Sequence, residues 1–382
     1  MMRWKQAAAL ALAGVLAAAS VFPALAVEQP SDMDDATWAR LQDNVLEYDE
    51  IENLVVYYNP VYRQVEDSIN VNITPLTDAV AALREDALEL RSDARKAKDD
   101  GDTMNYMINT AVADAGQDVA KSLEKAAKSV DSMTRSTKNQ IRRTMTSAIQ
   151  QMVIGYHTAS SSKELLDGLV EMYDAVYQST VTQQGLGMAT AADVQSAQAA
   201  LVSAQNSQKS VDDALVSLKQ NLCYMTGWAY DAQPEIGQVP APDLSRIDAM
   251  NPEVDVQTAI SYNPTIIEQR SLSGNGDVNR NYKFRALEET EAKIKTQVEV
   301  LYQAVIQAKT AYDAACSTMQ NAQITMDSAD RMYSLGMVGR LEYLQMKVGY
   351  LQQKMTYDSA VLSLTQAMET YDWALHGVIT LD

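Results

Sequence analysis

The sequence has few residues of the kinds on which enzymes and metalloproteins depend. Histidine, cysteine and phenylalanine occur only twice each. His157 and His376 have no cysteine or carboxylate at a metal-binding interval, so no metal site is predicted. No Ser, Cys or Thr lies in a recognisable nucleophile motif. These absences favour a protein that is not an enzyme and that needs no cofactor.

Glycine and proline are also scarce, with 15 and 9 residues in a chain of 382. Because both interrupt helices, their scarcity outside a few places favours long helices with small-residue contacts. After the N-terminal stretch, no segment has about 18 consecutive apolar residues, so no further membrane-spanning helix is predicted. We therefore expect an all-α fold with little or no β-structure.

Residues 1–26 are typical of a Sec signal peptide. Arg3 and Lys5 give the positive start, a short apolar stretch follows, and Ala24 and Ala26 form a small-x-small cleavage pattern. We expect the chain to be exported to the cell envelope, in the outer membrane and periplasm or at the cell surface. A retained N-terminal anchor is the alternative.

The chain is strongly acidic. Its 50 acidic and 31 basic residues give a formal net charge of −19. Such a surface repels phosphate backbones, which excludes nucleic-acid binding as the main function. The charge suits a channel lining that passes cations more easily than anions, and it equally suits simple solubility.

The chain contains two copies of one pattern, and each copy begins with the same signal. A short amphipathic segment ends in Tyr-Asn-Pro at residues 58–60 and again at 262–264. Proline forces the residue before it out of the helical region, so a helix is expected to end at each site. Each copy later has a glycine turn, at 185–190 and at 334–339. Internal repetition of this kind indicates two structural units.

A long helical pattern enters and leaves each glycine turn. Met145–Gln184 and Ala286–Tyr333 lead in, and the helices leading out end at Gly227 and Gly377. Apolar residues recur at steps of three and four in the outgoing helices, with Gln208 as a break in the first, which is typical of coiled coils. Each copy is therefore predicted to be a long antiparallel helical hairpin. The hairpins could cover each other or assemble with other chains.

The two copies differ in length. The first carries an insertion at about 82–143, read as helices at Ala82–Lys98 and Asn105–Arg143 around an Asp-Gly-Asp break. Four prolines mark residues 231–255 as an extended linker between the copies. We therefore assign 27–230 to the first hairpin repeat. Residues 256–382 form the second.

This duplicated pattern resembles the TolC-type outer-membrane efflux proteins. The closest stretches are Gly187–Gly227 and Met332–Gly377, with the two Asn-Pro segments in support. The resemblance implies a homotrimer whose hairpins close a helical tube. That tube would be a passive duct for efflux or secretion, working with a periplasmic adaptor protein and an inner-membrane pump. A secreted structural or interaction bundle without a channel is the alternative.

The resemblance also implies which residues would form the tips of the tube that face the adaptor. Glycines at the turns have a physical reason, because a reversing chain needs a residue that tolerates positive φ. The implied tip residues are Leu186, Gly187, Thr190 and Asp193 in the first copy and Leu335, Gly336, Gly339 and Glu342 in the second. Plain hairpin turns with no partner are the alternative.

The chain departs from this family in one respect. Its members carry membrane strands between the early and late helices of each repeat, and a strand of that kind needs about 9–11 alternating residues. Only Asn70–Thr74 has such a pattern, and residues 272–277 read as a loop. Direct membrane insertion of this chain is therefore in question.

Cys223 and Cys316 lie one in each half of the chain. Export allows a disulfide, but two buried small residues is the default interpretation.

Overall fold

The computed structural model describes residues 29–30, 33–67, 74–128, 135–271 and 277–379. Within these ranges nearly all regular structure is helical. The helices are α2 (Asp35–Arg40), α3 (Ile51–Tyr58), α4 (Pro60–Asp67), α5 (Thr74–Asp99), α6 (Thr103–Lys128), α7 (Arg135–Gly185), α8 (Ala191–Thr226), α9 (Leu244–Ala249), α10 (Pro252–Tyr262), α11 (Pro264–Ser271), α12 (Asp277–Ser334) and α13 (Arg340–Leu375), with a 3₁₀ turn at Tyr48–Glu50. The strands are β1 (Val45–Leu46) and β2 (Glu235–Ile236).

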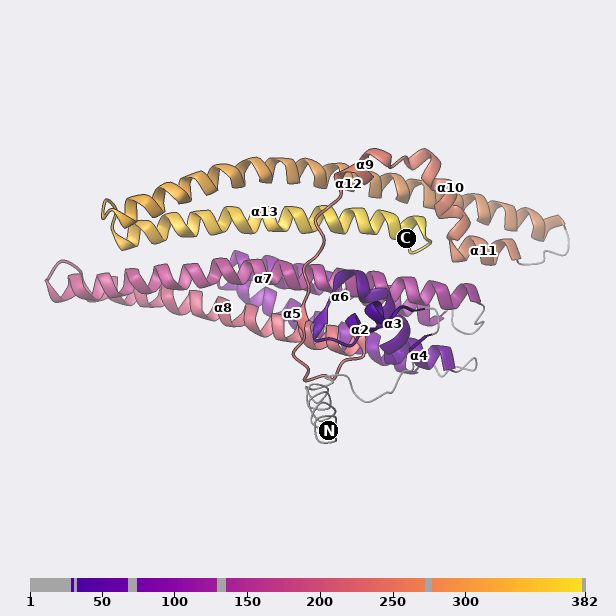
Figure 1. Cartoon of the computed structure of the whole chain (residues 1–382), viewed down its shortest axis with the longest axis horizontal. Coiled ribbons are helices and arrows are strands. Elements are labelled where there is room, and N and C mark those ends of the chain that lie inside the picture. The colour runs from indigo at the N-terminus through magenta and orange to yellow at the C-terminus, as the bar shows by residue number, and fades with distance from the viewer. Residues whose placement is uncertain (1–28, 31–32, 68–73, 129–134, 272–276, 380–382) are drawn as a thin grey trace, which may run out of the picture.

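Two long antiparallel hairpins dominate the molecule. The α7–α8 and α12–α13 hairpins lie lengthwise beside each other, with their turns at the same end (Figure 1). The incoming helices have 51 and 58 residues, longer than predicted at their N-terminal ends. The predicted all-α fold of two tandem hairpins is thus confirmed. No helix in the described ranges is both long enough and apolar enough to cross a membrane.

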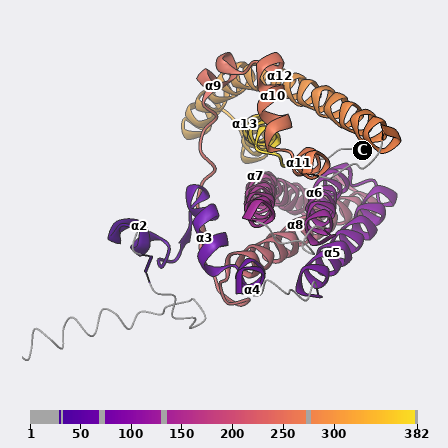
Figure 2. The same cartoon turned by 90° about the vertical axis from the view of Figure 1, so that its right-hand side faces the viewer.

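The four long helices form one open row. Helix α8 packs on α7, α7 packs on α13, and α13 packs on α12. Seen along the helix axes, α8 and α12 lie at the two ends of the row, and the row is curved (Figure 2). The two hairpins therefore meet through only one helix each.

The Tyr-Asn-Pro sites divide a pair of short helices in each copy, as predicted. Asn59 follows α3 and Asn263 follows α10, both with extended backbones. The Oδ1 atom of Asn59 accepts from the Tyr62 N–H (2.7 Å), and that of Asn263 accepts from the Ile266 N–H (3.1 Å). Each asparagine thus ends one helix and caps the next.

Each copy has its own apolar core, placed away from the turns. The first core joins α3, the middle of α7 and the end of α8, around residues such as Ile51, Ile149 and Leu222. The second joins α10, α11, α12 and α13, around Ile266 and Met368. Two separate cores agree with two structural copies.

The insertion of the first copy forms an antiparallel pair, α5 and α6, that packs on α7 and α8. Gly101, with φ 77°, makes the turn between them. The predicted continuous helix at Asn105–Arg143 is wrong, because α6 ends at Lys128 and residues 135–143 belong to α7. There Ile141 lies on the same buried face as Ile149, so these residues extend the hairpin helix. The predicted strand-like stretch at 70–74 lies outside the described residues except for Thr74, as do the signal peptide and most of the loop at 272–277.

The segment predicted as an extended linker contains regular structure. Its β2 pairs in parallel with β1, with Leu46 opposite Ile236, and its α9 packs in the second core. His157 of α7 binds the carbonyl oxygen of Gly237 through Nε2 at 2.7 Å. These contacts fix the segment that crosses between the copies.

Two sequence predictions about single residues need correction. The polar position in the buried seam of α8 is Ser207 rather than Gln208, because Ser207 lies one heptad before the buried Ala214. Both cysteines are free. Cys223 is buried as predicted, but Cys316 is only half-buried because α12 lies at an open end of the row.

Candidate functional site

Both hairpin turns have the same backbone geometry. After α7, the Gly187 N–H donates to the Gln184 carbonyl (2.9 Å) and the Met188 N–H to the Gln183 carbonyl (2.8 Å). After α12, Gly336 and Met337 make the equivalent bonds at 3.0 and 2.8 Å. This is the Schellman arrangement, in which a glycine in the left-handed region closes the last turn of a helix. Gly187 and Gly336 have φ of 75° and 69°.

The start of the outgoing helix differs between the copies. Thr190 and Asp193 form a capping box before α8: the Thr190 hydroxyl accepts from the Asp193 N–H (3.2 Å) and the Asp193 carboxylate accepts from the Thr190 N–H (2.8 Å). These bonds to Thr190 lower the pKa of the Asp193 carboxyl. Gly339 occupies the same place before α13 and makes no side-chain cap, while Glu342 lies in the first turn.

Large apolar side chains project from both turns. Leu186, Met188, Leu335 and Met337 are each between 70% and 75% exposed. The two methionines were not among the predicted tip residues, although both stand in the repeated turn sequence. We call these four side chains the apolar tips. Their exposure at matching positions is unusual for residues of this size.

Two stacked tyrosine rings lie next to the turn between α12 and α13. The rings of Tyr333 and Tyr343 stack with their centroids 4.4 Å apart, and the Tyr343 hydroxyl lies 2.9 Å from the Asp330 carboxylate. That hydrogen bond to Asp330 raises the pKa of the Tyr343 phenol. The stack joins the end of α12 to the beginning of α13, so the turn is held by side chains as well as by its backbone.

The structure keeps the eight predicted tip residues in two separate groups. Three of the first copy lie in the α7–α8 turn and three of the second copy in the α12–α13 turn, while Asp193 and Glu342 lie in the first turns of α8 and α13. Both turns lie at one end of the molecule (Figure 1). The arrangement presents two similar surfaces side by side.

The part of the first hairpin nearest its turn has no core. None of residues 169–200, all of which the structure describes, is buried. This stretch covers the end of α7, the turn and the beginning of α8. A helix pair of this length buries little apolar surface by itself, and most helical stability in proteins comes from packing an apolar face. This part of the hairpin therefore has apolar surface left for further contacts.

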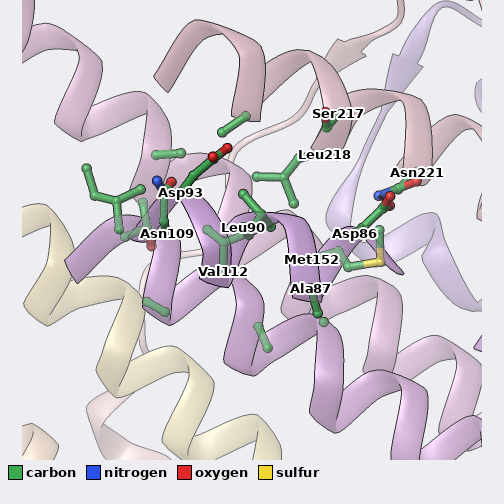
Figure 3. Close-up of a pocket in the computed structure, with 18 of the residues that line it drawn as sticks. Asp86, Ala87, Leu90, Asp93, Asn109, Val112, Met152, Ser217, Leu218 and Asn221 are labelled. Carbon is green, nitrogen blue, oxygen red and sulfur yellow. Dashed lines mark hydrogen bonds between the residues drawn. The ribbon is translucent and has the colours of Figure 1, made fainter. Parts of the chain in front are cut away.

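A groove of about 640 Å³ lies between the α5–α6 pair and the α7–α8 hairpin. Its middle is apolar and includes Leu90, Val112 and Leu218, while polar side chains stand toward its two ends (Figure 3). Asn221 donates to the Asp86 carboxylate (3.1 Å) at one end. The groove depends on the insertion of the first copy.

The two histidines have structural roles in this fold. Besides the bond of His157 described above, the Nδ1 atom of His376 lies 2.7 Å from the Asp372 carbonyl oxygen. Burial, together with the charge of Arg143, lowers the pKa of His376. Across the described ranges, no three His, Cys, Asp or Glu side chains are grouped to hold a metal ion.

No protein-family model and no curated protein sequence matches the chain. Its fold does match solved structures. The CusC channel, whose structures concern folding and transmembrane channel formation, aligns with a TM-score of 0.50 at 13% identity, covering 80% of this chain and 95% of the CusC chain. The chain has the TolC-type fold.

Two further solved structures align with lower TM-scores. The outer membrane channel CmeC of Campylobacter jejuni has a TM-score of 0.47 at 12% identity and covers 94% of this chain and 95% of its own. A membrane protein from Pseudomonas aeruginosa has a TM-score of 0.44 at 14% identity, with 93% and 98% covered. The alignment with CusC confirms, for the fold, the resemblance predicted from the sequence.

Proposed function

We propose that this chain is the exported subunit of a passive efflux or secretion duct in the cell envelope. Three copies would close a helical tube, and the tube would work with an adaptor protein and a separate membrane pump. The observation that carries the proposal is the open row α8–α7–α13–α12: within the described part of the chain, none of the other long helices packs on the outer sides of its two end helices near the tips. A row with two free edges can be completed by the edges of further copies.

The side chains on the free edges support this proposal. Val202 and Val216 on α8 stand two heptads apart, on one face of the helix, and both are exposed. On α12, Ile324 is 67% exposed and Val300 is also exposed. In a ring, α8 of one copy would meet α12 of the next and cover these residues. The coreless stretch at 169–200 would gain its missing contacts in the same way.

The apolar tips support the adaptor part of the proposal. In a closed tube, the tips of all copies would gather at one end, because both turns of each chain lie at the same end. Leu and Met side chains in a ring of matching turns form a surface that a partner protein can cover. Leu186, Gly187, Thr190 and Asp193 would form one contact, and Leu335, Gly336, Gly339 and Glu342 the other.

Light scattering on a sizing column, over a concentration series, tests the assembly. We expect a particle of three chains. Replacing the exposed Ile324 by Asp should shift the particle toward single chains without lowering the thermal midpoint of the monomer, because Ile324 is not covered within one chain. Leu88→Asp is the matched control, since Leu88 is exposed on α5, which is not one of the four helices of the row. A single chain at every concentration would exclude the duct and favour a secreted helical bundle.

Cross-linking in the native envelope tests the adaptor. A photo-reactive residue at Leu186 or Leu335 should give one defined product with an elongated helical envelope protein, identified by mass spectrometry. The same residue placed at Leu88 should not give that product. Absence of the product at both tips, in a strain with an intact trimer, would contradict an adaptor contact.

A further inference from the structure

The groove between the insertion and the first hairpin has the size and lining of a ligand site, and it is formed within a single chain. It is bounded by α5 and α6 on one side and by α7 and α8 on the other, with Ser363 and Gln366 of α13 also in its lining. Its volume of about 640 Å³ lies in the range of small-molecule sites. The second copy has no such insertion, so the groove occurs once per chain. It lies away from the tips and from the outer edge of α12.

The middle of the groove is apolar. Leu90 of α5, Val112 of α6 and Leu218 of α8 face one another there (Figure 3), and Met152 of α7 also lines the groove. Leu218 and Met152 are otherwise buried in the packing between the helices. An apolar ligand segment placed here would remove further apolar surface from water, which stabilises a complex by roughly 25 cal/mol per Å².

The polar groups stand at the two ends of this apolar middle. Asp86 and Asn221 lie at one end, and Asp93 and Asn109 lie at the other (Figure 3). Asp86 and Asp93 are separated by two turns of α5, about 10 Å along the helix axis. The groove thus has a carboxylate and an amide at each end.

Asn109 is the most informative of these residues. It is only 3% exposed, it lines the groove, and its side chain makes no hydrogen bond to any residue of the described chain. The remaining hydrogen-bond capacity of Asn109 is therefore available to a ligand in the groove.

The charges of the groove favour a cation. Four carboxylates line it, from Asp86, Glu89, Asp93 and Asp213, against the single ammonium group of Lys209. That ammonium group is already paired with Asp213 at 3.2 Å. Asp86 takes part in no ion pair within the described residues, and it accepts a hydrogen bond only from Asn221. An anionic ligand would be repelled here.

We propose that the groove binds an elongated organic dication whose apolar middle separates two ammonium groups. The apolar chain lies on Leu90, Val112 and Leu218. One ammonium group meets Asp86, and the other meets Asp93 and the Asn109 amide oxygen. The proposal goes beyond the duct function, because the site is complete in one chain and needs no assembly.

Isothermal titration with octamethylenediamine tests this site, because the spacing of its two amines is close to that of Asp86 and Asp93. We expect saturable one-to-one binding. Octanediol, which has the same chain without charge, and putrescine, which has a shorter chain, should each bind at least about tenfold more weakly. Asp86→Asn should weaken binding about 10- to 100-fold, the range expected for a lost charge-assisted hydrogen bond. Asp93→Asn should have a smaller effect in the same direction, because Lys96 already pairs with Asp93 at 2.9 Å.

Glu85→Gln is the matched control. Glu85 lies on α5 next to Asp86 but does not line the groove, so its loss should leave binding unchanged. Equal affinities of the wild type and Asp86→Asn, equal binding of octanediol, or no saturable binding would each overturn the proposal. Ile324→Asp, which is expected to block assembly, should leave binding intact. Failure of the site is therefore distinguishable from failure of the duct.

Discussion

Gly227 lies directly against the backbone carbonyl of Tyr58, so closely that a Cβ at this position would overlap with the carbonyl oxygen. The second copy repeats the contact between Gly377 and Tyr262. Both glycines have positive φ, 79° and 86°. The glycine that follows each outgoing helix, one residue after α8 and two residues after α13, thus meets the Tyr-Asn-Pro site that opens its own copy. This contact closes each repeat on itself and explains why the same two signals occur in both.

Gly227→Ala is expected to lower the free energy of unfolding by about 2–4 kcal/mol, because it adds both a steric overlap and an unfavourable φ. Gly377→Ala should behave in the same way. Urea denaturation followed by circular dichroism gives the change. Gly349→Ala in the middle of α13 is the control, since a Cβ there meets nothing within 4 Å. That variant should be neutral or more stable by about 0.5–1 kcal/mol. Equal losses at Gly227 and Gly349 would contradict the close contact.

The capping box gives a second prediction, confined to the first tip. Thr190→Ala removes the acceptor for the Asp193 N–H and should destabilise the beginning of α8 by about 1 kcal/mol. Hydrogen exchange of the Asp193 and Val194 amides, which donate to the Thr190 side chain and carbonyl, should become about fivefold faster. Ser196→Ala is the control, because the Ser196 hydroxyl bonds only to the Ala192 carbonyl within the helix. The same acceleration in both variants would mean that the capping box does not stabilise the beginning of α8.

Much of the fold could be predicted because the decisive signals are local. Proline fixes where α3 and α10 end, and glycines at positive φ fix both hairpin turns. The steps of three and four in α8 predict its buried face, and Leu201, Val211 and Leu218 are indeed buried. Such signals depend only on residues that are near one another in the sequence. They can therefore be read from a single sequence, without an alignment.

What could not be predicted depends on contacts between distant segments. No glycine or proline marks the boundary between α6 and α7, so the sequence reads as one helix there. The order of the four-helix row is set by the packing of α7 on α13, and nothing in either helix alone specifies that partner. The groove beside Asn109 exists only where α5 and α6 meet the first hairpin. Adaptor binding and trimer formation remain predictions.

The two free thiols differ in their surroundings, which gives a third prediction. Cys223 is buried, and burial raises the pKa of its thiol, whereas Cys316 is half-buried. In the single-chain Ile324→Asp variant, N-ethylmaleimide should modify Cys316 at least about tenfold faster than Cys223, as followed by peptide mass spectrometry. In urea the two rates should become similar. A native chain that yields no free thiol would instead indicate a disulfide.

Glu50 gives the last prediction, on the pH dependence of stability. Its side chain is only 3% exposed, and its Oε1 atom lies 2.8 Å from Nε of Arg40 in α2. Burial raises the pKa of the Glu50 carboxyl to about 7, although the charge of Arg40 opposes the shift. A carboxyl whose pKa is higher in the folded state binds its proton more tightly there. The stabilisation from this proton is therefore complete below about pH 4.5 and is lost as pH rises through about 7.

Urea denaturation across this pH range should consequently show a decline in stability as pH rises, superimposed on the titration of the other groups. Glu50→Gln keeps the shape of the side chain but cannot ionise, so it should remove that part of the decline. Glu85→Gln changes the net charge equally at an exposed position and should leave the decline in place. If the two variants and the wild type show the same pH dependence, Glu50 is already ionised without cost, and its ion pair with Arg40 outweighs its burial.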